Sequence, residues 1–457
     1  MDVDCVRLHH ENSRYFLFRD QTLAPVTAAE HYGAVINLDF DYIAYLNTLQ
    51  DFGFRLTRLF LFYREQRDDF NGVLGHQNTL APRPERYIAP WPRSGQPGCA
   101  DGLNKFDLSG WNEEYFSRLK DFCREAGARG IIVEVTLFSQ FYHNRNYGPW
   151  RINPLNHINN VNGVGQIEYN MFTTMKDPKV LAVQEQLVRK TVRELGGFDN
   201  IYYEICNEPN WQVGEGMTAD WHNRMIAVIR EEEAGLPCRH MIAVNEYHEG
   251  IVADQVDVFN FHYSILAFYG LASFYGRKRA VGFDETLSGI NGWETETIAQ
   301  RRMEAWEFMI KGGSLYNYLD VTYSTDDATG TGKVIFPDGQ RHDGTEIRKQ
   351  LQYLNGYLSR LDLISMKPDN GVIRRLPAEA TAYVLAHSGK VYVVYIREVG
   401  AGEMVIDLPE GEYLVEWFNP EEGSLVERGK VFSTGYLSVT LPLYDPDIVV
   451  KFQLRKE

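Results

Sequence analysis

Two glutamates stand at the ends of short apolar segments, and their side-chain chemistry sets the first expectation. Glu208 lies two residues after the segment 201–206 (IYYEIC) and precedes a proline, and Glu285 directly follows the segment 280–284 (AVGFD). Hydrolysis of a glycosidic bond needs two carboxyl groups beside that bond. One protonates the leaving oxygen, and the other attacks the anomeric carbon or activates a water molecule. The two glutamates are candidates for such a pair if the fold brings them to one site.

These glutamates belong to a series of eight apolar segments that alternate with amphipathic helical segments from residue 25 to about residue 361. Continuous apolar segments are typical of parallel strands covered on both faces. We predict strands at 25–30, 56–62, 131–138, 201–206, 241–245, 257–262, 280–284 and 314–320. Eight strands alternating with helices predict a (β/α)₈ TIM barrel. A doubly wound open sheet is the alternative, but no glycine-rich phosphate-binding motif follows the first segment.

Two of the intervening helices have clear signals. Asp177-Pro178 provides a capping residue and a first-turn proline, and Gly196-Gly197 ends that helix. The last helix keeps a spacing of four and three residues between its apolar positions Ile347, Leu351, Leu354, Leu358 and Leu361. Active sites of such barrels lie at the carboxyl ends of the strands. Glu208 and Glu285 are therefore expected to face one cavity, at the separation of about 5–5.5 Å that a retaining mechanism requires.

The stretch IYYEICNEPNW, together with the glutamate that follows 280–284, resembles clan A of the glycoside hydrolases, and within it the family 5 type. The resemblance covers about residues 25–361. It implies a retaining hydrolase in which Glu208 is the acid/base, Glu285 is the nucleophile and Asn207 binds the sugar 2-hydroxyl. It also matches Arg58 to the clan's arginine beside the nucleophile, where a cation keeps the carboxylate ionised.

The segment 257–262 departs from the family pattern. Family members of this type often carry His-x-Tyr there, with the tyrosine bonded to the nucleophile, whereas His262 and Tyr263 are adjacent here. Regular strand geometry turns only one of two neighbours inward, but we expect both near the site. The last barrel strand (YNYLD) lacks the family's tryptophan platform, so Trp293 or Trp211 is expected to stack on the sugar. Further candidates for the sugar pocket are His31, Trp150 and Asn245, and in the loops Tyr142 and His143.

Other acidic residues compete for the nucleophile's role. Glu246, Asp284 and Asp320 also lie at strand ends. We expect each of them to form a buried hydrogen bond or salt bridge instead. Glu134 lies inside the predicted strand 131–138 and is expected to be paired within the barrel, since an unpaired buried charge is costly.

Composition excludes several function classes. The formal net charge is −16 and no basic patch stands out, so nucleic acid is not an expected partner. No apolar run is long enough for a membrane helix, and no signal peptide is evident, which predicts a cytoplasmic protein unless a leader has been removed. The five cysteines are scattered without a CxxC motif. We therefore expect neither a disulfide framework nor a zinc site. The same pattern favours a reducing compartment for the protein.

The pattern changes near Pro368, where helical periodicity stops and alternating strands begin. We predict a catalytic barrel with its N-terminal lead-in at 1–365 and a small all-β sandwich at 366–457. The stretch VEWFNPEEG is similar to the β-sandwich domains appended to many bacterial clan A glycosidases. This domain is expected to pack on the barrel, and a carbohydrate-binding role is the alternative.

The sequence thus predicts a retaining hydrolase of β-linked glycosides that needs no cofactor or metal. The long connections 63–108 and 139–176 follow strand ends and could close one end of a cleft, which favours exo action on short oligosaccharides. Two alternatives stay open: a non-catalytic carbohydrate-binding barrel and a metal-dependent barrel hydrolase. The latter is disfavoured because no His-x-His stands at a strand end. The exact sugar and the oligomeric state are not evident.

Overall fold

Eight parallel strands form the central sheet of the computed structural model, which describes residues 4–30, 33–65, 79–141, 148–209, 219–245, 250–286, 297–332, 344–398, 402–442 and 446–455. The sheet runs in the order β4-β13-β12-β11-β10-β9-β8-β5. Its strands are β4 (Val26–Ala29), β5 (Leu56–Phe60), β8 (Ile132–Ser139), β9 (Ile201–Asn207), β10 (Ile242–Asn245), β11 (Val258–His262), β12 (Ala280–Glu285) and β13 (Leu315–Leu319). Each lies within two residues of its predicted bounds, so the predicted strands are confirmed.

The two ends of this sheet meet and nearly close it into a barrel. β4 and β5 are the outermost strands in the hydrogen-bonded order. The hydroxyl of Thr27 in β4 donates a hydrogen bond to the carbonyl oxygen of Leu56 in β5, at 2.9 Å. The predicted (β/α)₈ barrel is therefore the observed fold.

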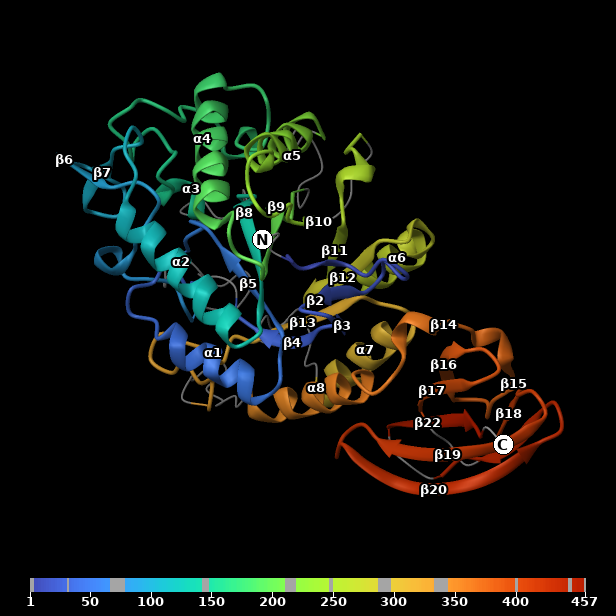
Figure 1. The fold of residues 1–457 in the computed structure, drawn as a ribbon. Coiled ribbons are helices and arrows are strands. Elements are labelled where there is room, and N and C mark those ends of the chain that lie inside the picture. Colours follow the sequence, from blue (N-terminus) through green and yellow to red (C-terminus); the bar gives the residue numbers. More distant parts are fainter. Residues whose placement is uncertain are drawn as a thin grey trace.

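Helices surround the barrel, as Figure 1 shows. They are α1 (Tyr42–Asp51), α2 (Glu113–Ala128), α3 (Pro149–Ile152), α4 (Pro178–Leu195), α5 (Ala219–Glu233), α6 (Ser264–Phe274), α7 (Ile298–Ile310) and α8 (Thr345–Leu358). The Asp177 side chain caps α4 by accepting hydrogen bonds from the backbone N–H groups of Lys179 and Val180. The described part of the chain has no helix long and apolar enough to cross a membrane.

A small antiparallel sheet covers the amino-terminal end of the barrel. It consists of β1 (Arg7–Leu8), β2 (Phe16–Phe18) and β3 (Gln21–Leu23). Phe16 and Phe18 pack in one buried cluster with the first residues of several barrel strands, among them Leu56, Ile132 and Val258. This packing closes one end of the barrel and leaves the carboxyl ends of the strands for a site.

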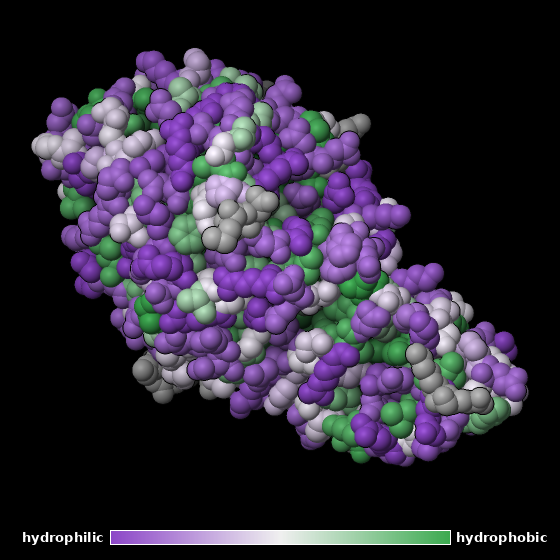
Figure 2. Space-filling model, viewed as in Figure 1, coloured by the Kyte–Doolittle hydropathy of each residue, from purple (hydrophilic) through white to green (hydrophobic). Residues whose placement is uncertain are grey.

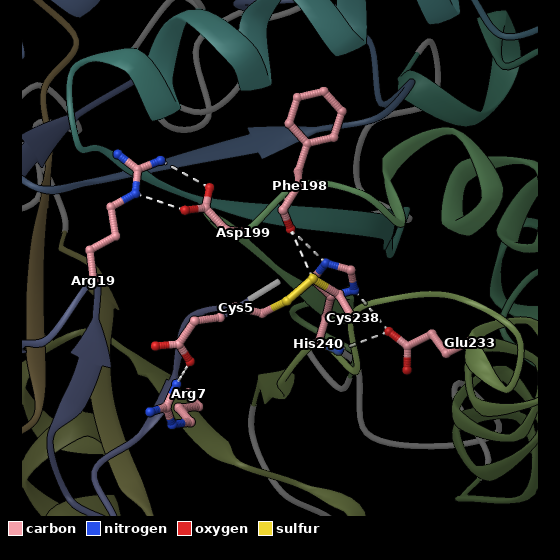
Figure 3. The surroundings of a disulfide bond; sticks show 9 residues. Cys5, Arg7, Arg19, Phe198, Asp199, Glu233, Cys238 and His240 are labelled. Atoms are coloured by element: carbon pink, nitrogen blue, oxygen red, sulfur yellow. Dashed lines mark hydrogen bonds and ion pairs between the residues drawn. A yellow bond between two sulfur atoms is a disulfide. The ribbon is translucent and has the colours of Figure 1, made fainter. Parts of the chain in front are cut away.

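A disulfide joins Cys5 to Cys238, just before β10, and corrects the prediction that the cysteines form none (Figure 3). The two residues are 233 positions apart, yet their Cα atoms lie 6.0 Å from each other. Sequence spacing could not show this, because the pairing depends on how the N-terminal segment folds back under the barrel. Close by, His240 contacts the Glu233 carboxylate and the Phe198 carbonyl oxygen, both at 2.9 Å. The other cysteines, at 99, 123 and 206, are free and buried.

Two antiparallel sheets make up the C-terminal region. One has the order β14-β16-β17-β22-β19-β20 and the other β15-β18-β21. Their strands are β14 (Lys367–Pro368), β15 (Ile373–Arg375), β16 (Thr381–His387), β17 (Val391–Arg397), β18 (Glu403–Ile406), β19 (Gly411–Asn419), β20 (Ser424–Ser433), β21 (Leu437–Thr440) and β22 (Asp447–Leu454). They enclose their own apolar cluster, which includes Ile396, Met404 and Trp417. The predicted all-β sandwich is confirmed, while the boundary at 365/366 stays a prediction.

The sandwich packs against α7 of the barrel. Trp306 stacks on Tyr395 with ring centroids 5.7 Å apart, and Arg302 forms a buried ion pair with Asp447 at 2.7 Å. The surface in Figure 2 is largely hydrophilic, with hydrophobic residues gathered near the junction of the two parts. Burial of aromatic rings and of a paired charge makes this junction a packed interface.

Candidate active site

Glu208 and Glu285 lie together at the carboxyl ends of barrel strands. Glu208 directly follows β9, Glu285 ends β12, and both side chains are almost fully buried. A carboxylate oxygen of each glutamate and a ring nitrogen of His262 all lie within 4.8 Å of one another. The structure thus brings together the two carboxyl groups that the sequence singled out.

Arg58, in the middle of β5, links several acidic groups of the site. It is fully buried and donates a hydrogen bond to Oε2 of Glu285 at 3.0 Å. Its Nη2 donates to Oδ1 of Asn207 at 2.8 Å and to Oε2 of Glu204 at 2.5 Å. Burial opposes the charged guanidinium, but the negative charges of Glu204 and Asp284 outweigh this effect and raise the pKa of Arg58 well above its usual value. The arginine is therefore a permanent cation beside Glu285.

His262 and Tyr263 both reach Glu208, although a regular strand would turn them to opposite faces. Nδ1 of His262 lies 2.9 Å from Oε1 of Glu208, and the Tyr263 hydroxyl donates to the same oxygen at 2.5 Å. The pairing of β11 with β12 shifts register at His262, and Tyr263 has a φ of 60°. These irregularities explain how neighbours share one partner. The tyrosine contacts Glu208 here, whereas the family pattern places it on the nucleophile.

The backbone at Glu208 is held in an unusual conformation. Its φ is 43°, a region that non-glycine residues seldom occupy. The Glu208 N–H donates a hydrogen bond to Oδ1 of Asn245 at 2.9 Å, and the amide of Asn207 contacts the Ser139 hydroxyl at 3.3 Å. Backbone strain of this kind is found at functional sites, where surrounding contacts sustain it. Asn245 thus supports Glu208 through the main chain.

Further acidic residues lie beneath the pair, inside the barrel. Glu134 accepts hydrogen bonds from the Tyr202 hydroxyl at 2.7 Å and from the Asn260 amide at 2.6 Å, which confirms that it is paired. Burial and the neighbouring charge of Glu204 raise the pKa of Glu134 well above its usual value. Burial also raises the pKa of Glu204, which contacts Arg58 and the Thr136 hydroxyl.

Glu204 was not among the predicted site residues. Its signal in the sequence is a charged residue inside an otherwise apolar barrel strand, which requires a buried partner. Two of the three rival acids, Asp284 and Asp320, lie within ion-pair distance of cations, as expected. Asp284 lies 3.5 Å from Arg58 and 3.6 Å from His262, and Asp320 lies 3.1 Å from Arg348.

Of the remaining predicted residues, the structure describes Trp150. Trp150 packs against Phe141 and Phe172, with ring centroids 5.2 and 5.6 Å apart, so its described contacts belong to an aromatic cluster. Six other predictions lie outside the described residues: His31, Tyr142, His143, Trp211, Glu246 and Trp293. The sugar platform therefore stays a prediction.

The donor atoms of Glu208, His262 and Glu285 are close enough to be considered as metal ligands. However, the Arg58 guanidinium already contacts Glu285 at 3.0 Å, and a divalent cation would be repelled by it. Nδ1 of His262 also lies 2.9 Å from Oε1 of Glu208, within hydrogen-bond distance. This donor set fits a hydrogen-bonded carboxyl pair and does not fit a metal site.

Comparisons with known proteins agree with the fold. A family model described as a domain of unknown function (DUF6298) matches residues 54–193, and no curated protein matches the chain. A solved structure of a candidate glycoside hydrolase from Bacteroides vulgatus is 13% identical, covers 99% of this chain and 83% of its own, and has a TM-score of 0.70. A solved structure of a family 5 glycoside hydrolase from the same species is 14% identical and has a TM-score of 0.63. The match covers 98% of this chain and 92% of that one. These are similarities of fold across both parts of the chain.

Proposed function

We propose that this protein is a retaining glycoside hydrolase with Glu285 as nucleophile and Glu208 as acid/base. The observation that carries the proposal is that an oxygen of each carboxyl group lies within 4.8 Å of an oxygen of the other, at the carboxyl ends of the barrel strands. Retaining enzymes hold their carboxyl groups about 5–5.5 Å apart, whereas inverting enzymes leave about 6.5–9.5 Å for a water molecule. The fold neighbours, which carry glycoside hydrolase names, support the same class.

In the first step, an ionised oxygen of Glu285 attacks the anomeric carbon while the bond to the leaving oxygen breaks. The proton of Glu208 passes to that oxygen, and the sugar becomes attached to Glu285. In the second step, Glu208 takes a proton from a water molecule whose oxygen attacks the anomeric carbon and releases Glu285. Arg58 keeps Glu285 ionised for the attack, and His262 and Tyr263 orient Glu208.

The proposed substrate is a β-linked glycoside, with exo action on short oligosaccharides as the favoured mode. We assign to Asn207, which contacts Arg58 and Ser139, the role of binding the sugar 2-hydroxyl that the family resemblance implies. The disulfide favours an oxidising compartment, since such bonds persist there. We therefore propose export rather than the cytoplasmic location that the sequence favoured.

The test is the mass of the intact protein after incubation with a panel of 2-deoxy-2-fluoro glycosides, followed by peptide mapping. We expect one sugar adduct, located on Glu285, and no adduct in the Glu285→Ala variant. Asp320→Asn is the matched control, because Asp320 is also buried beyond a barrel strand but pairs with Arg348. Hydrolysis of natural glycans without any adduct would contradict retention. Glycan binding without hydrolysis would favour the carbohydrate-binding alternative.

A further inference from the structure

Asp284 lies between the two cations of the site, and the main chain is bent to put it there. β11 and β12 pair Phe261 with Phe283 and then His262 with Glu285, so Asp284 is the extra residue of a bulge in β12. Successive side chains of a regular strand point to opposite faces, and a bulge redirects one of them. Consecutive residues Asp284 and Glu285 consequently both lie within ion-pair distance of Arg58.

The fully buried carboxylate of Asp284 bridges Arg58 and His262. Its Oδ2 lies 3.5 Å from Nε of Arg58, and its Oδ1 lies 3.6 Å from Nε2 of His262. Among the described residues, none of these four buried atoms has a hydrogen-bond partner at normal range. Each nitrogen therefore faces an oxygen that lacks a closer partner. Such contacts are often long in an unliganded site and tighten when substrate binds.

The other ring nitrogen of His262 faces the two glutamates. Nδ1 lies 2.9 Å from Oε1 of Glu208 and 3.7 Å from Oε2 of Glu285. A neutral imidazole carries only one N–H, whereas both nitrogens here face carboxylate oxygens. Burial favours the neutral ring, but the charges of Glu285 and Asp284 outweigh it and raise the pKa of His262 well above its usual value.

Neighbouring elements place further charged groups around this ring. The charged and titratable groups that touch His262 or its carboxylate partners are Arg58, Glu204, Glu208, Tyr263, Asp284 and Glu285. Asp284 is distinct among the acids because it contacts both cations and is not part of the proposed reaction. Removing it would leave the other contacts of His262 in place.

We propose that Asp284 is a positioning residue that keeps His262 as an imidazolium ion, with Nδ1–H directed at Glu208. The imidazolium lies between Glu208 and Glu285 and offsets the repulsion between their carboxyl groups. The contribution of this cation to bond cleavage rests on the proposed function. The protonation state of the ring does not, so the two can be tested separately.

The test is a pH titration of the ring nitrogens by NMR in protein labelled with ¹⁵N-histidine. The chain has 12 histidines, and the His262 signal is assigned by its loss in His262→Gln. In the wild type, we expect the imidazolium shifts of His262 to persist well above the ordinary midpoint near pH 6.5. In Asp284→Asn, we expect the midpoint to fall by at least about one pH unit, because one of the charges that favour the cation is gone.

Asp320→Asn is the control, since it also removes a buried carboxylate but one that pairs with Arg348, and His262 should titrate as in the wild type. A neutral His262 in the wild type at pH 7, or an unchanged midpoint in Asp284→Asn, would overturn the proposal. If that variant does not fold, Asp284→Ser removes the same negative charge with a smaller polar side chain. Its midpoint should also fall, and an unshifted titration would have the same meaning.

Activity gives a second measurement on any aryl glycoside that the wild type cleaves. Asp284→Asn should lower kcat/KM by about 10–100-fold, as the loss of a group that orients an active-site residue does. The limb of the pH profile set by His262 should move to lower pH in parallel with the NMR midpoint. A uniform loss without that movement would assign Asp284 a merely structural role. If the wild type cleaves no glycoside, the proposed function is contradicted. The conclusion about the protonation state of His262 from NMR is not affected.

Discussion

Replacing Arg58 with methionine removes the cation that the buried acids share. The guanidinium contacts Glu285 at 3.0 Å and Glu204 at 2.5 Å, and it lies 3.5 Å from Asp284. Removing one partner of a buried ion pair costs about 3–5 kcal/mol, because the charge left behind is uncompensated. We expect a loss of stability in this range at pH 8, since methionine keeps the apolar volume and removes only the charge and its hydrogen bonds.

The loss should depend on pH with a defined sign. Burial raises the pKa of Glu204 already in the wild type, and loss of the arginine raises it further. A glutamate whose pKa is higher in the folded protein stabilises the fold at pH values below its unfolded pKa of about 4.3. This stabilisation is lost as the pH rises through the pKa of the folded protein. The destabilisation of Arg58→Met should therefore be smaller at pH 5 than at pH 8.

The assay is thermal unfolding of the variant and of the wild type at both pH values. Arg375→Met is the control, because the Arg375–Glu403 pair is exposed and should contribute at most about 1 kcal/mol. Arg58→Lys keeps a charge but not the planar fork, so it should recover part of the loss. An Arg58→Met protein as stable as the control variant, or equally destabilised at both pH values, would refute the reasoning.

Two other predictions concern regions away from the acid pair. Cys5→Ser should lower stability by about 2–5 kcal/mol through loss of the bond to Cys238, and wild-type protein digested without reductant should yield a linked peptide that reduction removes. Intact free thiols on both residues in protein made under oxidising conditions would contradict it. Arg302→Met should lower the free energy of unfolding by about 3–5 kcal/mol, because it removes the arginine that pairs with the buried carboxylate of Asp447 at the junction with the sandwich. Unfolding midpoints no lower than those of Arg375→Met would show that this pair does not hold the junction.

The barrel strands could be predicted because they are apolar, regularly spaced and separated by helices with caps and glycine stops. Strand β12, for example, appears in the sequence as an apolar run that ends in acidic residues. The pairing of Cys5 with Cys238 could not be predicted, since it depends on the N-terminal sheet closing the bottom of the barrel. The antiparallel sheets after β14 were evident from period-two alternation and turn residues.

Within the site, the positions at strand ends were predictable and the irregular geometry was not. Glu208 and Glu285 follow from the rule that barrel sites lie at the carboxyl ends of strands, and Arg58, in the middle of β5, follows from the family resemblance. The contact of Tyr263 with Glu208 depends on a φ of 60° and on a shift in strand register, neither of which leaves a pattern in the sequence. The buried role of Glu204 depends equally on long-range pairing with Arg58.

Charge balance connects this buried network to the proposed chemistry. The acids are Glu134, Glu204, Glu208, Asp284 and Glu285, and the facing cations are Arg58 and His262. Burial and neighbouring charge raise the pKa of Glu134 and of Glu204, which favours their neutral forms. Asp284 and Glu285 each lie within ion-pair distance of both cations.

Glu208 lies beside the second of these cations. Its Oε1 is 2.9 Å from Nδ1 of His262 and accepts a hydrogen bond from the Tyr263 hydroxyl. The first step of a retaining hydrolase requires a protonated acid beside an ionised nucleophile. Because the raised pKa values of Glu134 and Glu204 favour their neutral forms, these two acids compete less for Arg58, and the guanidinium is left to favour the ionised form of Glu285. The acids beneath the site therefore bear on the proposed chemistry through the charge of Arg58 that they leave to the nucleophile.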